Sequence, residues 1–366
     1  MSRRAATAPD IRAATSEYEK WLGTRIPLIA ADLSRKHALM RASRFTFMRA
    51  TYYRWAQRWP EVCADEANAP HILAVGDLHV DNFGTWRDAE GRLVWGVNDL
   101  DEAWRLPFTN DLVRLAVSAR MAVEEHSLSL DPDTAMDTIL DGYREGLAGP
   151  ATPFVLAEAH PSLHKMATAR LKDPEKFWDK LRASRFVSQP VPVAALIALR
   201  RAMPGHELPT RIMHRIAGVG SLGRPRYVAI MEWHGGLVAR EAKPIIASAA
   251  AWAAGHSARV SALYAELLDC AVRCPDPFVF PMGRWLVRRL APDCSRIDLD
   301  TLPRDGDEAR LMHAMGKETA NVHLGSLGAR KLAADLRKRP KRWLRKAANR
   351  MTLEIERDWK EWKKGR

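Results

Sequence analysis

The sequence predicts an α+β fold with a mostly helical large lobe and a small lobe built on an antiparallel sheet. Apolar residues recur at helical spacing over most of residues 11–59, and again in shorter stretches that include 133–147 and 308–324. By contrast, residues 72–103 and 216–243 contain short apolar runs separated by turn-forming residues, which is typical of antiparallel hairpins. A chain of 366 residues is long enough for about two domains with substantial cores.

The N-terminal part of the chain is expected to be helical from Ile11 to Trp59, with a break at Pro27 because proline disrupts a helix interior. This segment is rich in arginine, and Arg49 lies between aromatic residues shortly before the first predicted strand. A guanidinium beside an acidic site can bind a phosphate or pair with a carboxylate. An ordinary surface salt bridge is the alternative for any one of these arginines.

Residues 72–103 carry the acidic side chains that suggest chemistry. The apolar run over 72–75 predicts a buried strand that ends at Gly76. Two further strands are predicted over 83–86 and 93–97, joined by a turn. This hairpin would bring together two polar clusters, which are Asp77, His79, Asp81 and Asn82 in one and Asp99, Asp101 and Glu102 in the other.

The two polar clusters have residue types that suit a metal-dependent reaction. Carboxylates and an amide at the ends of buried strands can hold a hard cation and position an oxygen nucleophile. Asp77 and Asn82 have the D-x-x-x-x-N spacing of a kinase catalytic loop, and Asp99 follows where such enzymes place a second metal-binding carboxylate. An exposed acidic turn beside a buried hairpin is the alternative, because short motifs recur by chance.

Helices are expected to fill most of the segment that follows. Asn110 or Asp111 can cap a helix that runs through Met121, which gives Asp111 a supporting, structural role. Further helices are predicted over 133–147 and 174–185, and from Pro192 to about Met203. We expect the proline-rich region 149–209 to supply helical packing around the site and the passage between the lobes.

The second informative stretch is residues 216–243. Gly218, Gly220 and Gly223 form a G-x-G-x-x-G pattern that includes Ser221. A dinucleotide-binding turn would open a helix, but here strand-like residues follow, interrupted by a His-Gly-Gly turn. In this setting the glycines predict a flexible hairpin that lays backbone amides over nucleotide phosphates. A plain tight hairpin is the alternative.

A cation is expected on the last strand of this unit, where it would contact phosphates. Arg240 is on that strand, with Glu241 and Lys243 beside it. Residues 247–274 are then expected to be helical, and residues 278–290 to form a strand pair. The helix predicted over 308–324 carries two lone histidines, which we interpret as structural; they are His313 and His323.

The net charge of +13 is concentrated at the C-terminus. Residues 330–366 contain 15 Lys and Arg against 5 Asp and Glu, which gives +10, so the rest of the chain is nearly neutral. We favour a terminal helix docked on the core by an apolar stripe. The alternative is a helix that binds an anionic lipid surface or nucleic acid. The stripe consists of Trp343 or Leu344, Ala347, Met351, Ile355, Trp359 and Trp362.

The composition, 47% hydrophobic and 28% charged, is that of a globular protein. No uncharged apolar run reaches the roughly 18 residues needed to cross a bilayer, and the N-terminus lacks the apolar core of a secretory signal. The absence of a CxxC pair favours reduced thiols over a disulfide framework or a zinc site. The cysteines are Cys63, Cys270, Cys274 and Cys294. We therefore expect a cytoplasmic protein without a transmembrane segment.

The predicted organisation has four parts. Residues 1–70 form an N-terminal helical segment, and residues 71–210 form the catalytic-loop and helical lobe. Residues 211–295 form the small sheet lobe with the glycine loop, and residues 296–366 form C-terminal helices with the basic tail. The acidic clusters and the glycine loop therefore fall in different lobes.

Four motifs in this order, GDLHVDNFG, NDLDEA, NDLVRLA and GVGSLG with LVAREA, resemble the bacterial family catalogued as domain of unknown function 2252. The resemblance covers about Phe45 to Ser326, and the family name supplies no established reaction. The first block also resembles the catalytic segment of aminoglycoside phosphotransferases, in which an HGD-x-H-x-x-N loop precedes an acidic strand and a helix start. This second resemblance implies a two-lobe, protein-kinase-like fold.

The kinase resemblance implies a role for each matching residue. Asp77 would orient or deprotonate an acceptor hydroxyl, and Asn82 and Asp99 would bind Mg²⁺, with Asp101 as a further carboxylate at the metal. Arg240 and the glycine loop, that is Gly218, Gly220, Ser221 and Gly223, would contact the phosphates of ATP or another nucleoside triphosphate. The supporting residues would be His79, Glu241, Arg49 and Asp111. Two positions depart from the pattern, since Val75 replaces the first His of HGD and Arg240 stands where Lys is usual.

The order of the motifs differs from that in kinases. The glycine loop, the Arg240 strand, the strand WLVRRL and the helix with NVHLG all follow the catalytic loop here, whereas in kinases they precede it. A circular permutation of the kinase-like fold accounts for this order, since neighbouring chain ends on a compact domain permit such a rearrangement. It predicts that Gly220 lies across a cleft from Asp77 and Asp99.

The leading hypothesis is a kinase-like phosphotransferase that uses ATP and Mg²⁺ to modify a hydroxyl-bearing small molecule or protein. A non-catalytic nucleotide-binding or regulatory protein on the same fold is the first alternative, prompted by Arg240. A metal-dependent phosphoesterase is suggested by GDLH, although a later GNH[DE]-type element is missing. An interaction module that binds nucleic acid or a membrane surface through the basic tail is the last alternative.

Overall fold

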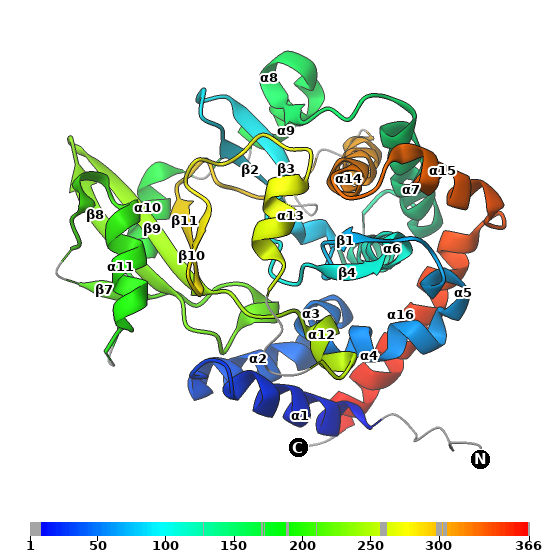
Figure 1. Cartoon of the computed structure of the whole chain (residues 1–366), viewed down its shortest axis with the longest axis horizontal. Helices are drawn as coiled ribbons and strands as arrows, with labels where there is room; N and C mark the ends of the chain where they lie inside the picture. The colour runs from blue at the N-terminus through cyan, green and yellow to red at the C-terminus, as the bar shows by residue number, and fades with distance from the viewer. Residues whose placement is uncertain are drawn as a thin grey trace.

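The computed structural model describes residues 9–126, 128–169, 171, 173–187, 190–209, 211–256, 262–297, 302 and 306–364. Helices predominate among these residues, and the strands form antiparallel sheets, so the predicted α+β class is confirmed. Figure 1 shows a six-stranded sheet at one side of the molecule and a helical body at the other. The six-stranded sheet and the helical body are called the sheet lobe and the helical body below.

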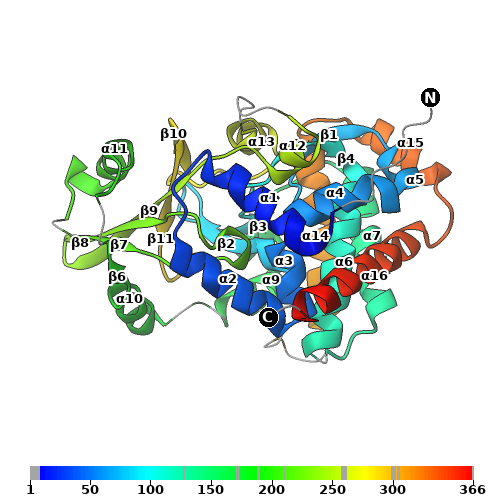
Figure 2. The same ribbon diagram turned by 90° about the horizontal axis from the view of Figure 1, so that it is seen from below.

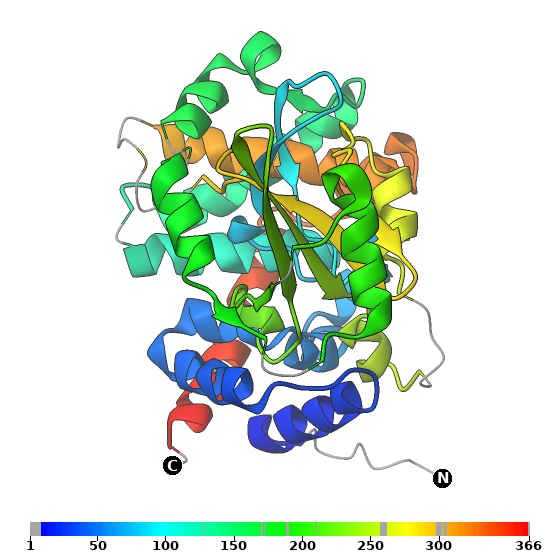
Figure 3. The same ribbon diagram turned by 90° about the vertical axis from the view of Figure 1, so that its left-hand side faces the viewer.

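The six-stranded sheet has the order β10-β11-β9-β8-β7-β6. Side chains alternate between its two faces. Helix α11 covers one face through Leu199, and helix α10 covers the other through Leu181 (Figure 3). The predicted sequence of strand, glycine loop, strand, turn and strand corresponds to β7, β8 and β9. The elements of this lobe are α10 (Pro174–Arg182), β6 (Arg185–Phe186), α11 (Val193–Ala202), η2 (Pro204–His206), β7 (Ile212–His214), η3 (Val219–Ser221), β8 (Tyr227–Trp233), β9 (Gly236–Pro244), β10 (Phe280–Met282) and β11 (Trp285–Leu290).

The helical body is built around α7 and α14, which pack against each other and against α6. Two small sheets lie beside them, β1 with β4 and β2 with β3 and β5. The acidic hairpin predicted from the sequence is β2 and β3, paired from Phe83 opposite Val97 to Arg87 opposite Leu93. The elements are α5 (Ala64–Ala67), β1 (His71–Ala74), η1 (Val80–Asn82), β2 (Phe83–Arg87), β3 (Leu93–Val97), β4 (Trp104–Pro107), α6 (Phe108–His126), α7 (Pro132–Ala148), β5 (Phe154–Val155), α8 (Leu156–Ala159), α9 (Pro161–Thr168), α12 (Ala249–Ala253), α13 (Tyr264–Cys270), α14 (Asp307–Leu324) and α15 (Ala329–Lys338).

Four N-terminal helices lie in the lower part of the molecule, below the sheet and the helical body (Figure 1). The predicted break near Pro27 is confirmed, because one helix ends at Gly23 and the next begins at Ala30. The segment after the break contacts the glycine loop, since the backbone N–H of Ile29 donates to the carbonyl oxygen of Gly223 at 2.9 Å. These helices are α1 (Ile11–Gly23), α2 (Ala30–Ala42), α3 (Arg44–Ala50) and α4 (Tyr52–Val62).

The basic C-terminal segment forms α16 (Trp343–Lys364), which runs beside α6 (Figure 2). Its apolar stripe is buried, including Trp343, Met351 and Trp362, so the predicted docking of this helix on the core is confirmed. Arg54 of α4 binds Asp358 through two hydrogen bonds of 2.8 and 3.2 Å, which fixes α16 further. Binding of the basic side to an anionic surface stays a prediction.

Two expectations drawn from composition can be compared with the structure. All four cysteines are free thiols, as predicted. Within the described ranges, no helix is both long and apolar enough to cross a membrane.

Candidate functional site

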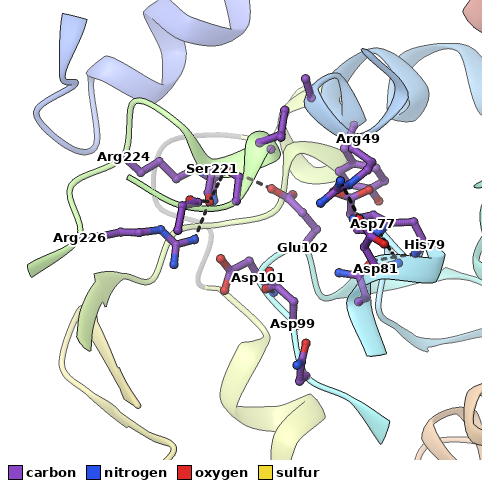
Figure 4. Close-up of a pocket in the computed structure, with 18 of the residues that line it drawn as sticks. Arg49, Asp77, His79, Asp81, Asp99, Asp101, Glu102, Ser221, Arg224 and Arg226 are labelled. Carbon is purple, nitrogen blue, oxygen red and sulfur yellow. Dashed lines mark hydrogen bonds and ion pairs between the residues drawn. The ribbon is translucent and has the colours of Figure 1, made fainter. Parts of the chain in front are cut away.

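A polar cavity of about 540 Å³ lies between the sheet lobe and the helical body (Figure 4). Its lining comes from segments far apart in the chain: the N-terminal helices, the two acidic clusters, the glycine loop and the segment after β11. Gly220, Asp77 and Asp99 all line it, so the predicted cleft between the glycine loop and these carboxylates is present.

The turn that follows β1 presents Asp77 to the cavity. Gly76 has φ of +81°, and a Cβ there would lie 2.3 Å from the carbonyl oxygen of Glu102, so the turn requires glycine. Asp111 holds the turn in place, because its carboxylate accepts from the backbone N–H of Val75 at 2.7 Å and of Gly76 at 3.0 Å. The prediction that Asn110 or Asp111 caps the start of helix α6 is wrong, because α6 already begins at Phe108 and Asp111 lies inside its first turn.

A buried polar chain extends from Asp111 away from the cavity. Nε2 of His323 lies 3.2 Å from Asp111 Oδ2, and Nδ1 of His323 lies 2.9 Å from the hydroxyl of Tyr143. All three side chains are fully buried. His323 is therefore structural, as predicted, and its contact with Asp111 connects α14 to the turn that carries Asp77.

Asp77 is partly exposed to the cavity, at 18% of its side-chain surface, and is paired with a completely buried arginine. Nε of Arg114 donates to Asp77 Oδ1 at 2.7 Å. Burial raises the pKa of Asp77 to about 7, against the opposing effect of Arg114. The guanidinium of Arg114 also lies 5.0 Å from the ring centre of Tyr52. Asp77 is therefore poised to exchange a proton near neutral pH.

The rest of the first acidic cluster forms a single helical turn, η1. The amide oxygen of Asn82 accepts from the backbone N–H of His79 at 2.8 Å, and Nδ1 of His79 accepts from the N–H of Asp81 at 3.2 Å. Burial lowers the pKa of His79 well below its usual value, so the ring is neutral. His79 therefore stabilises this turn through its ring nitrogen. Asn82 lines the cavity, and its amide oxygen already accepts one hydrogen bond.

The second acidic cluster is neutralised by cations from the sheet lobe. Nζ of Lys243 lies 2.6 Å from Asp101 and 3.4 Å from Asp99. Although burial acts in the opposite direction, Lys243 and Arg288 hold the pKa of Asp99 below its ordinary value. Glu102 is bound by Arg224 at 3.0 Å. Asp99 is therefore ionised at neutral pH.

The glycine loop borders the cavity next to Asp77. A Cβ on Gly220 would lie 2.9 Å from the carbonyl oxygen of Arg49 and 3.7 Å from Asp77 Oδ2, so a side chain would fill this approach. Nζ of Lys36 donates to the carbonyl oxygen of Gly220 at 3.3 Å. Gly218 and Ser221 also line the cavity, and Gly223 adopts φ of +94° at the end of the loop.

Arg240 does not point to this cavity. Its Nε donates to the carbonyl oxygen of Ala202 at 3.0 Å, and its guanidinium lies 4.4 Å from the ring centre of Phe278. The prediction that Arg240 contacts nucleotide phosphates is therefore wrong for this conformation. The physical reason is the alternation of side chains along β9, which places Glu241 and Lys243 on the face next to the cavity and Arg240 on the opposite face.

Glu241 organises three arginines at the wall formed by the sheet. Its fully buried carboxylate is bound by Arg215 at 2.7 Å, by Arg226 at 2.9 Å and by Arg288 at 2.7 Å. Burial opposes ionisation, but these three cations hold the pKa of Glu241 well below its usual value. One negative charge therefore faces three positive charges, and all three arginines line the cavity.

The residues that could hold a metal are few. Among the described residues, no group of three or more His, Cys, Asp and Glu side chains is arranged to hold a metal ion. Asp99, with 38% of its side chain exposed, and the neighbouring amide of Asn82 still offer hard oxygen ligands at the cavity wall. This set fits Mg²⁺, which commonly takes one or two carboxylates and completes its shell with water and phosphate oxygens.

Several residues that line the cavity or pair with its carboxylates were not predicted from the sequence. Arg114 lies three residues after Asp111, on the same face of α6, and this helical spacing could have indicated it. Lys243 could have been preferred over Arg240 from the two-residue period of a strand. By contrast, Arg296 and Lys36 have no motif around them, and only the folded chain brings them to the cavity.

The fold and the cavity together define an α+β protein with a cationic, carboxylate-containing site. A family model described as "Uncharacterized protein conserved in bacteria (DUF2252)" matches residues 28–178. The predicted family resemblance is confirmed over these residues, which contain both acidic clusters but end before the glycine loop. No curated protein and no solved structure matches the chain. These comparisons give no evidence of similarity to kinases or of circular permutation, so both stay predictions.

Proposed function

We propose that the protein is a kinase-like phosphotransferase that moves a phosphoryl group from a nucleoside triphosphate to a hydroxyl group of an acceptor. The observation that carries the proposal is the meeting of Asp77, Asp99 and the glycine loop around one polar cavity. Three groups in that cavity match the needs of the reaction: a carboxylate with a pKa of about 7, an ionised carboxylate for a metal, and a wall of arginines.

In the proposed reaction the acceptor oxygen attacks the γ-phosphorus, and the bond from that phosphorus to the bridging oxygen breaks, which releases a nucleoside diphosphate. Asp77 orients the hydroxyl and takes its proton. The arginines around Glu241 and the glycine loop hold the phosphates. Bound Mg²⁺ would neutralise phosphate charge, and Asn82 and Asp99 are the residues that would hold it.

A circularly permuted kinase-like fold is part of this proposal. The first and last described helices lie side by side, with the guanidinium of Arg12 in α1 at 4.8 Å from the ring centre of Trp362 in α16. Contact between α1 and α16 is compatible with such a rearrangement. Lys243, not Arg240, supplies the cation on β9 that pairs with the second acidic cluster.

The first test is nucleotide binding. With ATP and Mg²⁺ at about 100 times the dissociation constant, the wild-type protein should gain about 2.7 kcal/mol, seen as a melting temperature raised by a few degrees. Asp99→Ala should lose this shift. Lys243 keeps Asp101 as a partner at 2.6 Å in that variant, so loss of folding is not expected. A wild-type protein that shows no Mg²⁺-dependent binding of any nucleoside triphosphate would contradict the proposal.

The transfer rate is expected to rise with pH through about 7. The pKa of Asp77 is raised to about 7, so the carboxyl is protonated below that pH and cannot accept the proton of a hydroxyl. Above it the carboxylate is ionised and the rate should level off. The measurement is the rate under saturating nucleotide between pH 5.5 and 9. A profile without this ionisation would exclude Asp77 as the base, and Asp77→Asn should be inactive at every pH.

A non-catalytic nucleotide-binding protein is the second candidate. One observation favours it: the predicted catalytic carboxylates already have cationic partners, Asp77 with Arg114 and Asp99 with Lys243. Nucleotide binding without turnover on a broad panel of hydroxyl acceptors would support this candidate. Any turnover that disappears in Asp77→Asn would reject it.

A further inference from the structure

Five of the eight Lys and Arg side chains that line the cavity form two groups on opposite sides of the acidic residues. The Glu241 group comprises Arg215, Arg226 and Arg288. The Asp81 group comprises Arg49 and Arg296, which lie 2.7 and 2.8 Å from the same carboxylate oxygen of Asp81. Figure 4 shows Arg49, Asp77 and Asp81 together at one side and Arg226 at the other, with Asp99 and Asp101 between them.

We propose that the acceptor is an anion, namely a hydroxyl compound that carries a phosphate or carboxylate group, and that this group binds to Arg49 and Arg296. The inference rests on the proposed function and names the substrate class of the same site. The arginines of the Glu241 group then bind the triphosphate, and those of the Asp81 group bind the anionic group of the acceptor.

The Asp81 group has unused capacity for an anion. Two guanidinium groups share one carboxylate, so one positive charge is left without compensation. Arg49 is only 16% exposed, and its buried Nε has no hydrogen-bond partner among the described residues. A buried donor without a partner is costly, and a guanidinium binds phosphate or carboxylate through two hydrogen bonds. An anionic ligand would satisfy both requirements.

Arg49 lies beside Asp77, the residue that would take the proton of the acceptor. The carbonyl oxygen of Arg49 and the carboxylate of Asp77 both lie next to Gly220, so Arg49 is on the side of the cavity where Asp77 would take a proton. Asp77 is also among the charges that act on the guanidinium of Arg49. An anion held at Arg49 would leave the rest of a small acceptor close to Asp77.

The charge of the cavity also argues against a cationic acceptor. Eight Lys and Arg side chains line it, against five Asp and Glu side chains. Each of these five carboxylates already has a cationic partner among the described residues: Asp77 with Arg114, Asp81 with Arg49, Asp99 and Asp101 with Lys243, and Glu102 with Arg224. An ammonium group would find no uncompensated carboxylate here, so polycationic amino sugars do not fit this site.

The test uses a crossed pair of variants of the full chain, Arg49→Gln and Arg215→Gln. Each removes one arginine and leaves its carboxylate paired, Asp81 with Arg296 and Glu241 with Arg226 and Arg288. The protein is first saturated with Mg²⁺ and a non-hydrolysable ATP analogue, and inorganic phosphate or acetate is then titrated by calorimetry. Filling the nucleotide site first prevents the probe from binding there.

Arg49→Gln should weaken binding of phosphate or acetate about tenfold or more and leave nucleotide affinity within about threefold. Arg215→Gln should do the reverse. Arg296→Gln provides a second variant, because Arg296 is 44% exposed and its loss should not disturb the core. Tighter binding of phosphate would indicate an acceptor that carries a phosphate group, and tighter binding of acetate would indicate one that carries a carboxylate. In turnover assays, glycerol 3-phosphate or glycerate should be favoured over glycerol and glucosamine, and Arg49→Gln should raise the KM for the anionic acceptor.

Two failures can be told apart. If the nucleotide analogue binds but neither phosphate nor acetate binds afterwards, or binds equally well to Arg49→Gln, the anionic acceptor is wrong and the proposed function stands. The same holds if neutral or cationic hydroxyl compounds are the better acceptors. If no nucleotide binds to the wild-type protein, the proposed function and this inference fall together.

Discussion

Replacement of Asp111 by alanine is expected to lower the free energy of unfolding by about 3–5 kcal/mol and to abolish phosphoryl transfer. Asp111 is fully buried, and its carboxylate accepts from the backbone N–H groups of Val75 and Gly76 and contacts Nε2 of His323. Alanine would leave these donors buried without an acceptor. The turn they belong to presents Asp77, so the loss of stability and the loss of activity have one cause.

Urea denaturation measures the first effect, and hydrogen exchange of the Val75 and Gly76 amides locates it. Both amides should exchange faster in Asp111→Ala. Tyr143→Phe is the matched control, because it removes only the hydroxyl that lies 2.9 Å from His323 Nδ1 and leaves the two amide hydrogen bonds to Asp111 in place. It should cost about 1 kcal/mol and retain activity. An alanine variant with wild-type stability would show that Asp111 does not hold the turn.

Much of the fold could be predicted because local patterns decide it. Strands β2 and β3 lie within one residue of the predicted ranges, since two short, mostly apolar runs flank a turn-forming DAEG segment. Similarly, the apolar stripe of α16 predicted a docked helix because a helix with such a face buries it. The start of α6 was less predictable, since Asp111 is a good capping residue whose carboxylate binds a distant turn instead.

The candidate site could be predicted only in part. The acidic loop and the glycine loop are local motifs, and their meeting followed from the kinase resemblance and the permuted order. The cations that complete the cavity were not predictable in the same way. The sequence indicates Arg49 as a supporting residue, but Arg296 has no motif around it, and nothing in the sequence indicates that both arginines reach Asp81. Arg240 was predicted from its motif to reach the cavity, and it does lie on the predicted strand. The alternation of side chains along that strand nevertheless places it on the face away from the cavity.

A second large effect is expected for Glu241→Gln. The substitution keeps the shape of the side chain and removes the only charge that compensates Arg215, Arg226 and Arg288 within the group. Removing one partner of a buried ion pair costs about 3–5 kcal/mol, and here three cations lose theirs together. We expect a loss of at least that size in low salt, measured by urea denaturation at pH 7.5.

The matched control is Glu318→Gln, which removes the charge of another buried glutamate. Its oxygens accept from the N–H of Val97 at 3.2 Å and from Asn321 at 3.1 Å, and no described arginine forms a salt bridge with it. Burial raises the pKa of Glu318 to about 7. Because the folded protein binds this proton more tightly than the unfolded chain does, the contribution of Glu318 to stability is full below about pH 4 and is lost as pH rises through 7. Glutamine should therefore cost no more than about one hydrogen bond, about 1 kcal/mol, at pH 7.5.

Anions should rescue the Glu241 variant if the arginines around that residue bind phosphates. Three guanidinium groups without their carboxylate form a stronger anion site than the wild-type group does, so pyrophosphate should stabilise Glu241→Gln more than wild type and more than Glu318→Gln. Chloride at the same ionic strength should restore less, since general screening lacks the bidentate hydrogen bonds. Equal stabilisation of all three proteins by pyrophosphate would mean that the Glu241 group is a structural cluster, and the donor phosphates would then have to bind elsewhere in the cavity.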